Sequence, residues 1–339
     1  MAPSRLRYVS NVTGVAAGSS GVADQTNRAL ERAGEALLAG GSSLAHAVAA
    51  TVYLRDAADF AAMNDAYRRA WSTDPPTRTT LISDLLEDGA RVQMSFVGVP
   101  AGAERVAIHP RDWAQSPNPY SYAIRSGDTV WCSGLIPRDG RDHSVVIGDT
   151  AVQTRAVLRN AGVLLAAAGL THADVASARV VLADIAEFRI MTAEYGRAFG
   201  GAFPARATVQ MKLTSAQYRV EMTFVASRAA RRRLGDRDPA NPTNTPAVRA
   251  GHHLYVAGIP GASAADVLRR LDDRLALARQ HRGDIEELIV YLQDLRTWAD
   301  VRAAFVEYFE GAMPACTVVR ADLAAGFTLE IMATAHADV

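Results

Sequence analysis

The sequence predicts an α+β protein made of three tandem copies of one unit, folded together as an intramolecular pseudo-trimer. Three observations support this expectation. A chain of 339 residues is too long for one ordinary domain, an internal repeat runs through it, and the hydrophobic periodicity changes in the same order within each copy. With 49% hydrophobic and 21% charged residues, the composition is that of a globular protein and not of a disordered one.

The repeat defines the copies. Residues 25–93 align without a gap with residues 153–221, and each matched pair lies 153 − 25 = 128 positions apart. A third, more diverged copy follows at an offset of 294 − 184 = 110 positions. Positions kept or nearly kept between copies include Asp56, Asp184 and Asp294, then Phe60, Phe188 and Trp298, then Tyr67 and Tyr195, and finally Arg78 and Arg206.

These alignments predict domains at residues 1–100, 117–228 and 245–339. Turn-forming and polar residues at 100–118 and 229–245 predict linkers between them. The second linker carries the arginine run 231–233, which we expect to be a solvated charge cluster and not a site for an anionic partner.

The second copy shows the elements best. A turn at 126–128 precedes a strand at 129–133, and apolar residues at helical spacing predict a helix over 151–168 that stops at Gly169. A strand, a helix and two further strands follow at residues 178–182, 187–199, 207–211 and 219–226. The unit therefore has the order ββαβαββ, with one layer of helices on one sheet.

A sheet that is covered by helices on one face must bury its other face. Three such sheets can close around a common core, which predicts a monomeric pseudo-trimer, open to further oligomerisation. Three clefts then lie at the domain boundaries, where small-ligand sites commonly form.

Charge and hydropathy disfavour several function classes. Lys+Arg and Asp+Glu both number 36, so no net charge attracts nucleic acid, and no window approaches the roughly 18 apolar residues of a membrane span. Lys212 is the only lysine and no glycine-rich loop precedes it, which disfavours Schiff-base and phosphate-loop mechanisms. We therefore expect no nucleic-acid partner and no membrane association.

Cysteine and histidine placement gives further expectations. Cys132 and Cys316 lie far apart, and residues 1–12 contain no apolar signal segment, so we expect a cytoplasmic protein without a disulfide framework. The eight histidines show no metal-ligand spacing. We expect neither a metal nor another cofactor.

Copy two carries five short motifs in a fixed order: PYS at 119–121, CSGLIP at 132–137, QTR at 153–155, FPARATV at 203–209 and VEM at 220–222. Together, with Glu221 placed 221 − 206 = 15 residues after Arg206, they resemble the YjgF/RidA family. The resemblance covers nearly the whole chain as three tandem domains, strongest in copies one and two. It implies a YjgF-like, or chorismate mutase-like, fold in each domain.

Members of this family typically form homotrimers whose interface clefts hydrolyse reactive enamines and imines of 2-amino acids to 2-oxo acids and ammonia. The resemblance implies such a deaminase here, acting on a small carboxylate-bearing substrate in an inter-domain cleft. It implies catalytic roles for Glu221, Tyr120 and Ser133 and substrate-binding roles for Arg206 and Gly134.

The residue types suit these roles. The planar fork of Arg206 matches a carboxylate, and a partly buried Glu221 could hold water and transfer protons. Gly134 would let a ligand approach the backbone, and the hydroxyl of Tyr120 could bind the substrate. The alternatives are structural: salt bridges for the charged residues, strand-end packing around Gly134 and a core tyrosine.

The other copies depart from the pattern. Copy one keeps Arg78 and Asn64, which the resemblance assigns to substrate binding. Gln93 stands in place of the glutamate, where we expect it to contribute hydrogen bonds to binding, but it cannot exchange a proton. Copy three has Cys316 in place of the arginine, and we expect a buried free cysteine in a scaffold lobe. We therefore expect an incomplete copy-one site, and Arg206 and Glu221 together in the best-equipped cleft.

Two other functions remain open at this level. Chorismatases resemble a YjgF-like pseudo-trimer and cleave an enol ether of a carboxylated ring, so a specialised-metabolism enzyme of that kind is one alternative. A metabolite-binding protein that has lost catalysis is the other, suggested by Gln93 and Cys316. A ribonuclease label that the family has carried finds little support in a neutral chain without a basic-aromatic motif.

Overall fold

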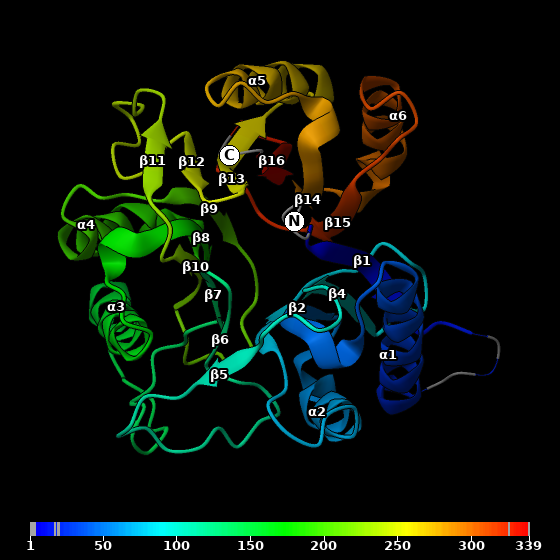
Figure 1. The fold of residues 1–339 in the computed structure, drawn as a ribbon, viewed down its shortest axis with the longest axis vertical. Helices are drawn as coiled ribbons and strands as arrows, with labels where there is room; N and C mark the ends of the chain where they lie inside the picture. Colours follow the sequence, from blue (N-terminus) through cyan, green and yellow to red (C-terminus); the bar gives the residue numbers. More distant parts are fainter. Residues whose placement is uncertain (1–4, 17, 19–20, 325, 338–339) are drawn as a thin grey trace.

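A computed structural model describes residues 5–16, 18, 21–324 and 326–337 of the chain. This part of the chain forms three sheets arranged as a ring of three lobes, with the strands toward the middle and the α-helices on the outside (Figure 1). The predicted α+β class and the three-unit organisation are confirmed.

The first lobe has a 4-stranded sheet in the order β1 (Arg7–Thr13), β4 (Val92–Gly98), β2 (Ala47–Leu54) and β3 (Thr77–Ile82). Helices α1 (Val22–Ala39) and α2 (Phe60–Arg68) belong to it.

The second lobe has a 6-stranded sheet in the order β5 (Val106–Ile108), β6 (Ala123–Ser126), β7 (Thr129–Cys132), β10 (Val220–Ser227), β8 (Val175–Leu182) and β9 (Ala205–Gln210). Its helices are α3 (Thr150–Ala167) and α4 (Phe188–Phe199).

The third lobe repeats this 6-stranded arrangement with β11 (Arg231–Leu234), β12 (Ala247–Ala250), β13 (His253–Gly261), β16 (Leu329–His336), β14 (Ile285–Leu292) and β15 (Ala315–Arg320). Its helices are α5 (Ala264–Ala276) and α6 (Trp298–Tyr308).

Equivalent positions occupy equivalent registers. In each lobe, the edge strand that follows the second helix pairs in parallel with its neighbour; these strands are β3, β9 and β15. This pairing places Arg78 opposite Ala50, Arg206 opposite Ala178 and Cys316 opposite Leu288. Arg78, Arg206 and Cys316, which are separated by 128 and 110 positions, therefore occupy the same point in three similar sheets.

The repeated aspartates have a structural role. Each precedes the short 3₁₀ turn that leads into the second helix of its lobe, and its side chain accepts a backbone N–H two residues later at 2.9 Å. Such N-caps satisfy a backbone donor that the turn leaves unpaired. The three residues are Asp56, Asp184 and Asp294.

The repeated Gln-Thr pair is also structural. Nε2 of Gln153 donates to the carbonyl of Gln217 at 2.8 Å, and its Oε1 accepts the N–H of Arg219 at 2.7 Å. Gln25 makes the equivalent contacts with Gly89 and Arg91. These contacts fix helix α3 to the loop before β10, which carries Glu221, and helix α1 to the loop before β4, which carries Gln93.

The inner faces of the three sheets share one hydrophobic cluster. Its buried members come from all three lobes and include Leu81, Val209, Tyr291 and Val319. Around it, β3 contacts β7, β9 contacts β13, and β15 contacts β1. The edge strand that follows the second helix of each lobe therefore packs against the next lobe. Burial of these inner faces holds the ring together.

The two predicted linkers each contain a short strand. Strand β5 lies in the segment 100–118 and adds to the second sheet, and β11 lies in 229–245 and adds to the third. Both are edge strands, too short to show a hydrophobic period in the sequence. The linker segments are therefore parts of the sheets and not free connections.

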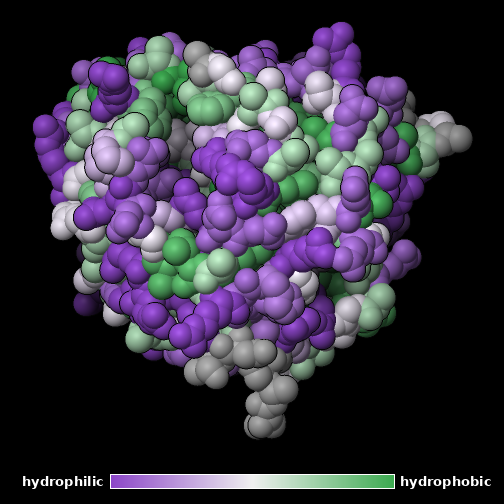
Figure 2. Space-filling view, turned by 90° about the horizontal axis from the view of Figure 1, so that it is seen from above, coloured by the Kyte–Doolittle hydropathy of each residue, from purple (hydrophilic) through white to green (hydrophobic). Residues whose placement is uncertain are grey.

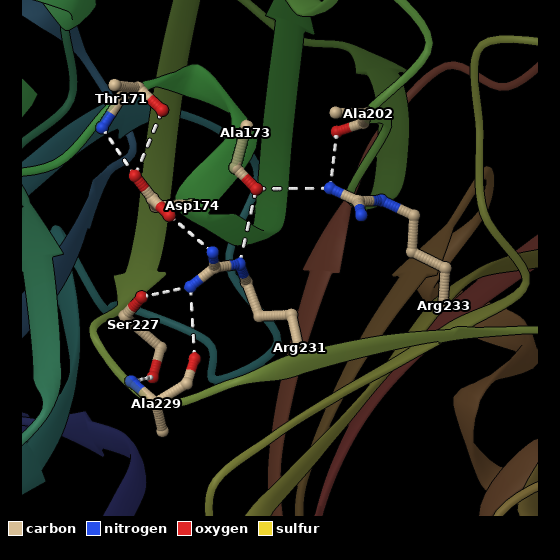
Figure 3. Close-up of polar contacts among 8 residues, drawn as sticks. All are labelled: Thr171, Ala173, Asp174, Ala202, Ser227, Ala229, Arg231 and Arg233. Atoms are coloured by element: carbon tan, nitrogen blue, oxygen red, sulfur yellow. Dashed lines mark hydrogen bonds and ion pairs between the residues drawn. The ribbon is translucent and has the colours of Figure 1, made fainter.

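The arginine run forms β11 and anchors it to the second lobe (Figure 3). Arg231 forms an ion pair with Asp174 and donates to the carbonyls of Ala229 and Ala173 at 3.0 and 3.2 Å. Arg233 donates to the carbonyls of Ala173 and Ala202 at 3.1 and 3.0 Å. Arg232 and Arg233 are both exposed, as expected from the sequence, but Arg233 is also held by backbone carbonyls of the second lobe.

On the face seen in Figure 2, hydrophobic residues occur in small groups among hydrophilic ones. None of the helices in the described ranges is both long and apolar enough to cross a membrane.

Candidate functional site

The first site lies between the first and second lobes, around Arg78 of β3. Its side chain is 5% exposed, and Nη2 donates to Oδ1 of Asn64 on α2 at 2.6 Å. Cζ lies 4.9 Å from the ring centre of Tyr67 and 5.8 Å from that of Tyr120. Nη1 is buried without a hydrogen-bond partner among the described residues. The guanidinium therefore keeps a donor for a ligand.

Glu221 enters this site from β10 of the second lobe. Burial raises the pKa of its carboxyl to about 8, although Arg179 and Arg78 act in the opposite direction. The carboxyl lies against Gly134, where a methyl group would collide with Oε1. The glycine of the SG turn is therefore required because no other side chain leaves room for the glutamate.

Ser133 and Gly134 hold the backbone of Arg78. Oγ of Ser133 accepts the N–H of Arg78 at 2.8 Å and donates to the carbonyl of Ser121 at 2.7 Å. The N–H of Gly134 donates to the carbonyl of Arg78 at 3.1 Å. The hydroxyl and amide that we expected to act on the substrate are thus engaged in positioning the arginine strand, whereas Tyr120 lines the site with its ring.

The second site lies between the second and third lobes, around Arg206 of β9. This side chain is 2% exposed, and its Cζ lies 4.6 Å from the ring centre of Tyr195 and 5.5 Å from that of Phe188. Nη2 donates to Oδ1 of Asn241 at 3.0 Å, while Nη1 is buried without a partner among the described residues. The surroundings of Arg206 repeat those of Arg78.

Asn244 does for Arg206 what Ser133 and Gly134 do for Arg78. Its Oδ1 accepts the N–H of Arg206 at 2.8 Å, and its Nδ2 donates to the carbonyl of the same residue at 3.2 Å. Sequence reasoning missed Asn241 and Asn244 because both lie in the predicted linker. The sequence did contain a signal for Asn244. The offset of 124 positions that relates Gly134 to Gly258 also relates Tyr120, which lines the first site, to Asn244 (244 − 120 = 124).

Glu330 of β16 completes the second site from the third lobe. It is 7% exposed, and burial raises its pKa to about 8 against the effect of Arg206 and a hydrogen bond from the backbone of Thr208. A methyl group on Gly258 would collide with its Oε1, as at Gly134. Arg206 and Glu330 line a cavity of about 470 Å³.

The third interface, between the third and first lobes, has neither the buried arginine nor the buried glutamate of the other two. Gln93 donates to the carbonyl of Val318 at 3.1 Å, Asn11 donates to that of Cys316 at 2.7 Å, and Oδ1 of Asn11 accepts the N–H of Val318 at 2.9 Å. Burial, with a smaller contribution from Glu287, raises the pKa of the Cys316 thiol to about 12. A protonated thiol is a poor nucleophile, so this interface is joined and not reactive.

These positions correct the expected pairing. Arg206 and Glu221 lie at different interfaces, because each arginine meets the glutamate of the next copy. Arg78 therefore does not lack a carboxyl, and Gln93 lies across from Cys316 instead. The third lobe is more than a scaffold, since it supplies Glu330.

Side chains that bind metals are not gathered in either site. Across the described ranges, no group of three or more His, Cys, Asp and Glu side chains is placed to hold a metal ion. The free donors in the two sites belong to guanidinium groups, which bind carboxylates and phosphates.

Comparison with known proteins identifies a family and several relatives of this chain. The family model described as Endoribonuclease L-PSP matches residues 6–99 and 113–228. A RutC family protein of Sulfurisphaera tokodaii is 39% identical over 110 residues, covering 32% of this chain and 88% of that protein. Human 2-iminobutanoate/2-iminopropanoate deaminase is 35% identical over 108 residues, covering 32% and 79%.

Among solved structures, the Rid family protein YyfA of Yersinia pestis is 28% identical, with a TM-score of 0.35, and covers 37% of this chain and 99% of that chain. The two sequence relatives each match about a third of this chain. With the family model matching more than half of the sequence, the chain belongs to the YjgF/RidA family.

Proposed function

We propose that this protein hydrolyses imines and enamines of 2-amino acids to 2-oxo acids and ammonia in two of its three inter-lobe clefts. The observation that carries the proposal is a pair of buried arginines, Arg78 and Arg206, each with an unpaired Nη1 and each facing a glutamate from the next lobe. An unpaired buried donor costs roughly 1–3 kcal/mol, so a ligand acceptor there is favoured.

The arginine binds the substrate carboxylate. Its Nη2 is held by Asn64 in the first cleft and by Asn241 in the second, which fixes the orientation of the guanidinium. The aromatic rings beside each arginine exclude water and strengthen the ion pair with the substrate. The reacting carbon, attached to that carboxylate, then lies on the side of the glutamate.

The glutamate transfers protons. With a pKa of about 8, Glu221 and Glu330 are mostly protonated at pH 7 and can donate a proton to the imine nitrogen. The carboxylate that remains accepts a proton from the attacking water, which forms a carbinolamine. Returning that proton to nitrogen breaks the C–N bond, and the hydroxyl proton passes back to the glutamate as ammonia leaves and the 2-oxo acid forms.

The human relative named as a 2-iminobutanoate/2-iminopropanoate deaminase supports this reaction class. A larger carboxylated substrate, such as a ring, is a second candidate for the second cleft alone. The cavity of about 470 Å³ favours it, because such a volume accommodates more than a three-carbon imine.

The test measures ammonia and 2-oxo acid release from 2-iminobutanoate, generated in place by an amino-acid oxidase. We expect Arg78→Ala and Arg206→Ala each to leave the other cleft working and the double variant to lose at least roughly a hundredfold, as expected when charged ligand contacts are removed. Cys316→Ala, at the same register in the third interface, is the matched control and should behave as the wild type.

An absence of acceleration by the wild type would reject the deaminase proposal. A double variant with full activity would reject the two arginines as its binding groups.

A further inference from the structure

The second cleft contains more positive charge than binding one carboxylate requires. Arg270 and Arg274, from helix α5 of the third lobe, line the same cavity of about 470 Å³ as Arg206. Resting on the function proposed above, we propose that this cleft takes a substrate with two anionic groups, one bound by Arg206 and the second by Arg274 with Arg270 beside it.

Arg274 is available to a ligand. The side chain is half-buried, and no hydrogen bond or ion pair within the described part of the chain holds it. Burial lowers the pKa of Arg274, and the neighbouring charge of Arg270 lowers it further. A second anion would relieve this repulsion.

Arg270 is fixed in place. Its Nη1 donates to the carbonyl of Pro260 at 2.5 Å and lies 3.5 Å from a carboxylate oxygen of Asp266. Pro260 belongs to strand β13, as does Gly258, which lies against Glu330. Arg270 is thus tied to the strand that packs against the glutamate.

Acidic groups near the cavity do not cancel this charge. Glu330 is held mostly neutral at pH 7 by its raised pKa of about 8. Asp238 lines the cavity and acts on Arg274, but it is exposed, so solvent weakens the attraction. Asp273 faces Arg274 from the same helix but makes its ion pair with Arg269, at 3.2 Å. Three guanidinium groups therefore face one ionised carboxylate of the lining.

Much of the remaining lining is apolar. Phe188, Pro246, Pro260 and Phe327 contribute to the wall of the cavity. Such a wall fits a carbon chain or ring whose two ends carry the charge.

The first cleft lacks this arrangement. The offset of 110 positions that aligns β8 with β14 places Asn160 at the position of Arg270 and Leu164 at that of Arg274. Asn160 donates to the carbonyl of Arg138 at 2.6 Å, and Leu164 is fully buried in the core of its lobe. Arg138 is itself occupied, since its Nε donates to the hydroxyl of Tyr218 at 2.5 Å. The first cleft therefore has no arginine at the positions of Arg270 and Arg274.

Calorimetric titration tests the inference without requiring turnover. The probes are 2-oxobutanoate with one anionic group, 2-oxoglutarate with two carboxylates, and 3-phosphoglycerate with a carboxylate and a phosphate. The protein carries Arg78→Ala, so that binding reports on the second cleft. We expect the better dianion to bind roughly tenfold tighter than 2-oxobutanoate, as expected for one additional charged hydrogen-bonded pair.

Arg274→Gln should reduce this ratio of dissociation constants to near one, and Arg274→Lys should keep part of it. Arg302→Gln is the matched control, because Arg302 is exposed on helix α6 of the same lobe and does not line the cavity. It should leave the ratio unchanged. Tighter binding of 2-oxoglutarate identifies the second group as a carboxylate, and tighter binding of 3-phosphoglycerate identifies it as a phosphate.

The two proposals fail in different ways. A ratio near one in the parent protein, no measurable binding of either dianion, or a ratio that survives Arg274→Gln would overturn the inference even if 2-iminobutanoate is hydrolysed. Conversely, a strong Arg274-dependent preference in a protein without hydrolytic activity would support the second anion site while rejecting the deaminase.

Discussion

At the scale of single residues, the two clefts depend on glutamates that are kept protonated by burial. Glu221 and Glu330 each have a pKa of about 8, whereas the third interface has Gln93 at the equivalent place. Glutamine is close in shape to a protonated glutamic acid but cannot release a proton. The third interface therefore lacks both groups, with Gln93 at the place of the glutamate and Cys316 at that of the arginine.

The raised pKa of Glu221 predicts how stability depends on pH. Between the ordinary pKa of about 4.5 and the folded value of about 8, the folded state holds a proton that the unfolded state has released. The free energy of unfolding should therefore fall as pH rises through this window and level off above it. We expect Glu221→Gln to weaken this dependence and to melt at a higher temperature than the wild type at pH 8.

Thermal unfolding at pH 5 and pH 8 measures this effect. Glu104→Gln is the control, because Glu104 is exposed and pairs with Arg125 at the surface. Identical pH dependence in the wild type and in Glu221→Gln would contradict the buried, protonated state of this group.

The same pKa predicts a pH profile for catalysis. If protonated Glu221 and Glu330 donate to the imine nitrogen, kcat/KM should decline as pH rises through about 8. The measurement is 2-oxo acid release between pH 6 and pH 10 for the wild type. Activity that rises throughout this range would indicate a general base instead and would exclude the proposed proton donor.

Gly134 offers a test of close approach. A methyl group there would collide with Oε1 of Glu221 and lie 3.1 Å from Oγ1 of Thr79. We expect Gly134→Ala to destabilise the fold by about 1–3 kcal/mol, the usual effect of overpacking, and to remove activity from the first cleft. Urea unfolding and activity in an Arg206→Ala background measure both effects, and wild-type values in both would show that the carboxyl lies elsewhere.

At the scale of elements, the segment between the second and third lobes acts as part of the second cleft. Strand β11 is fixed to the second lobe by Arg231 and Arg233 and pairs with β12 of the third lobe. The chain that follows it brings Asn241 and Asn244 to Arg206. The segment that begins with a short edge strand thus positions Arg206 of a neighbouring sheet.

We expect Arg231→Met to lower the free energy of unfolding by about 2 kcal/mol, because it removes a half-buried ion pair and charged hydrogen bonds. Arg232→Met is the control, since Arg232 lies on the same strand and is exposed. It should change stability by less than about 0.5 kcal/mol. Urea unfolding compares them, and equal midpoints would show that β11 is not anchored through Arg231.

Most elements could be predicted because their periodicity reflects burial. The expected helix at 151–168 corresponds to α3, and the expected strand at 178–182 lies within β8. By contrast, β5 and β11 have three and four residues, too few to show a period, and β11 consists mostly of arginine. Its strand conformation follows from pairing with β12 and from the acceptors around Arg231, which no local pattern records.

At the scale of the whole molecule, the chain contains the three contacts that a ring of three separate subunits would make. Strands β3, β9 and β15 each meet the next lobe, and the inner faces share one core. Because each sheet has already buried its inner face within the chain, a further copy is not needed for that purpose.

We therefore expect one chain per particle in solution. Light scattering coupled to size-exclusion chromatography measures the mass, and dilution should leave it unchanged. A mass of more than one chain would contradict this expectation.

The sequence by itself determined the three copies, their α+β elements and the positions equivalent to Arg78, Arg206 and Glu221. It could do so because identical packing requirements leave identical residues at fixed offsets, and because burial leaves a period. Only the tertiary structure decided that Arg78 meets Glu221, that Arg206 meets Glu330 and that Asn241 supports the second of these pairs. The physical reason is that each cleft forms between the edge strand after the second helix of one copy and the sheet of the next copy. Its residues therefore come together only when the ring closes.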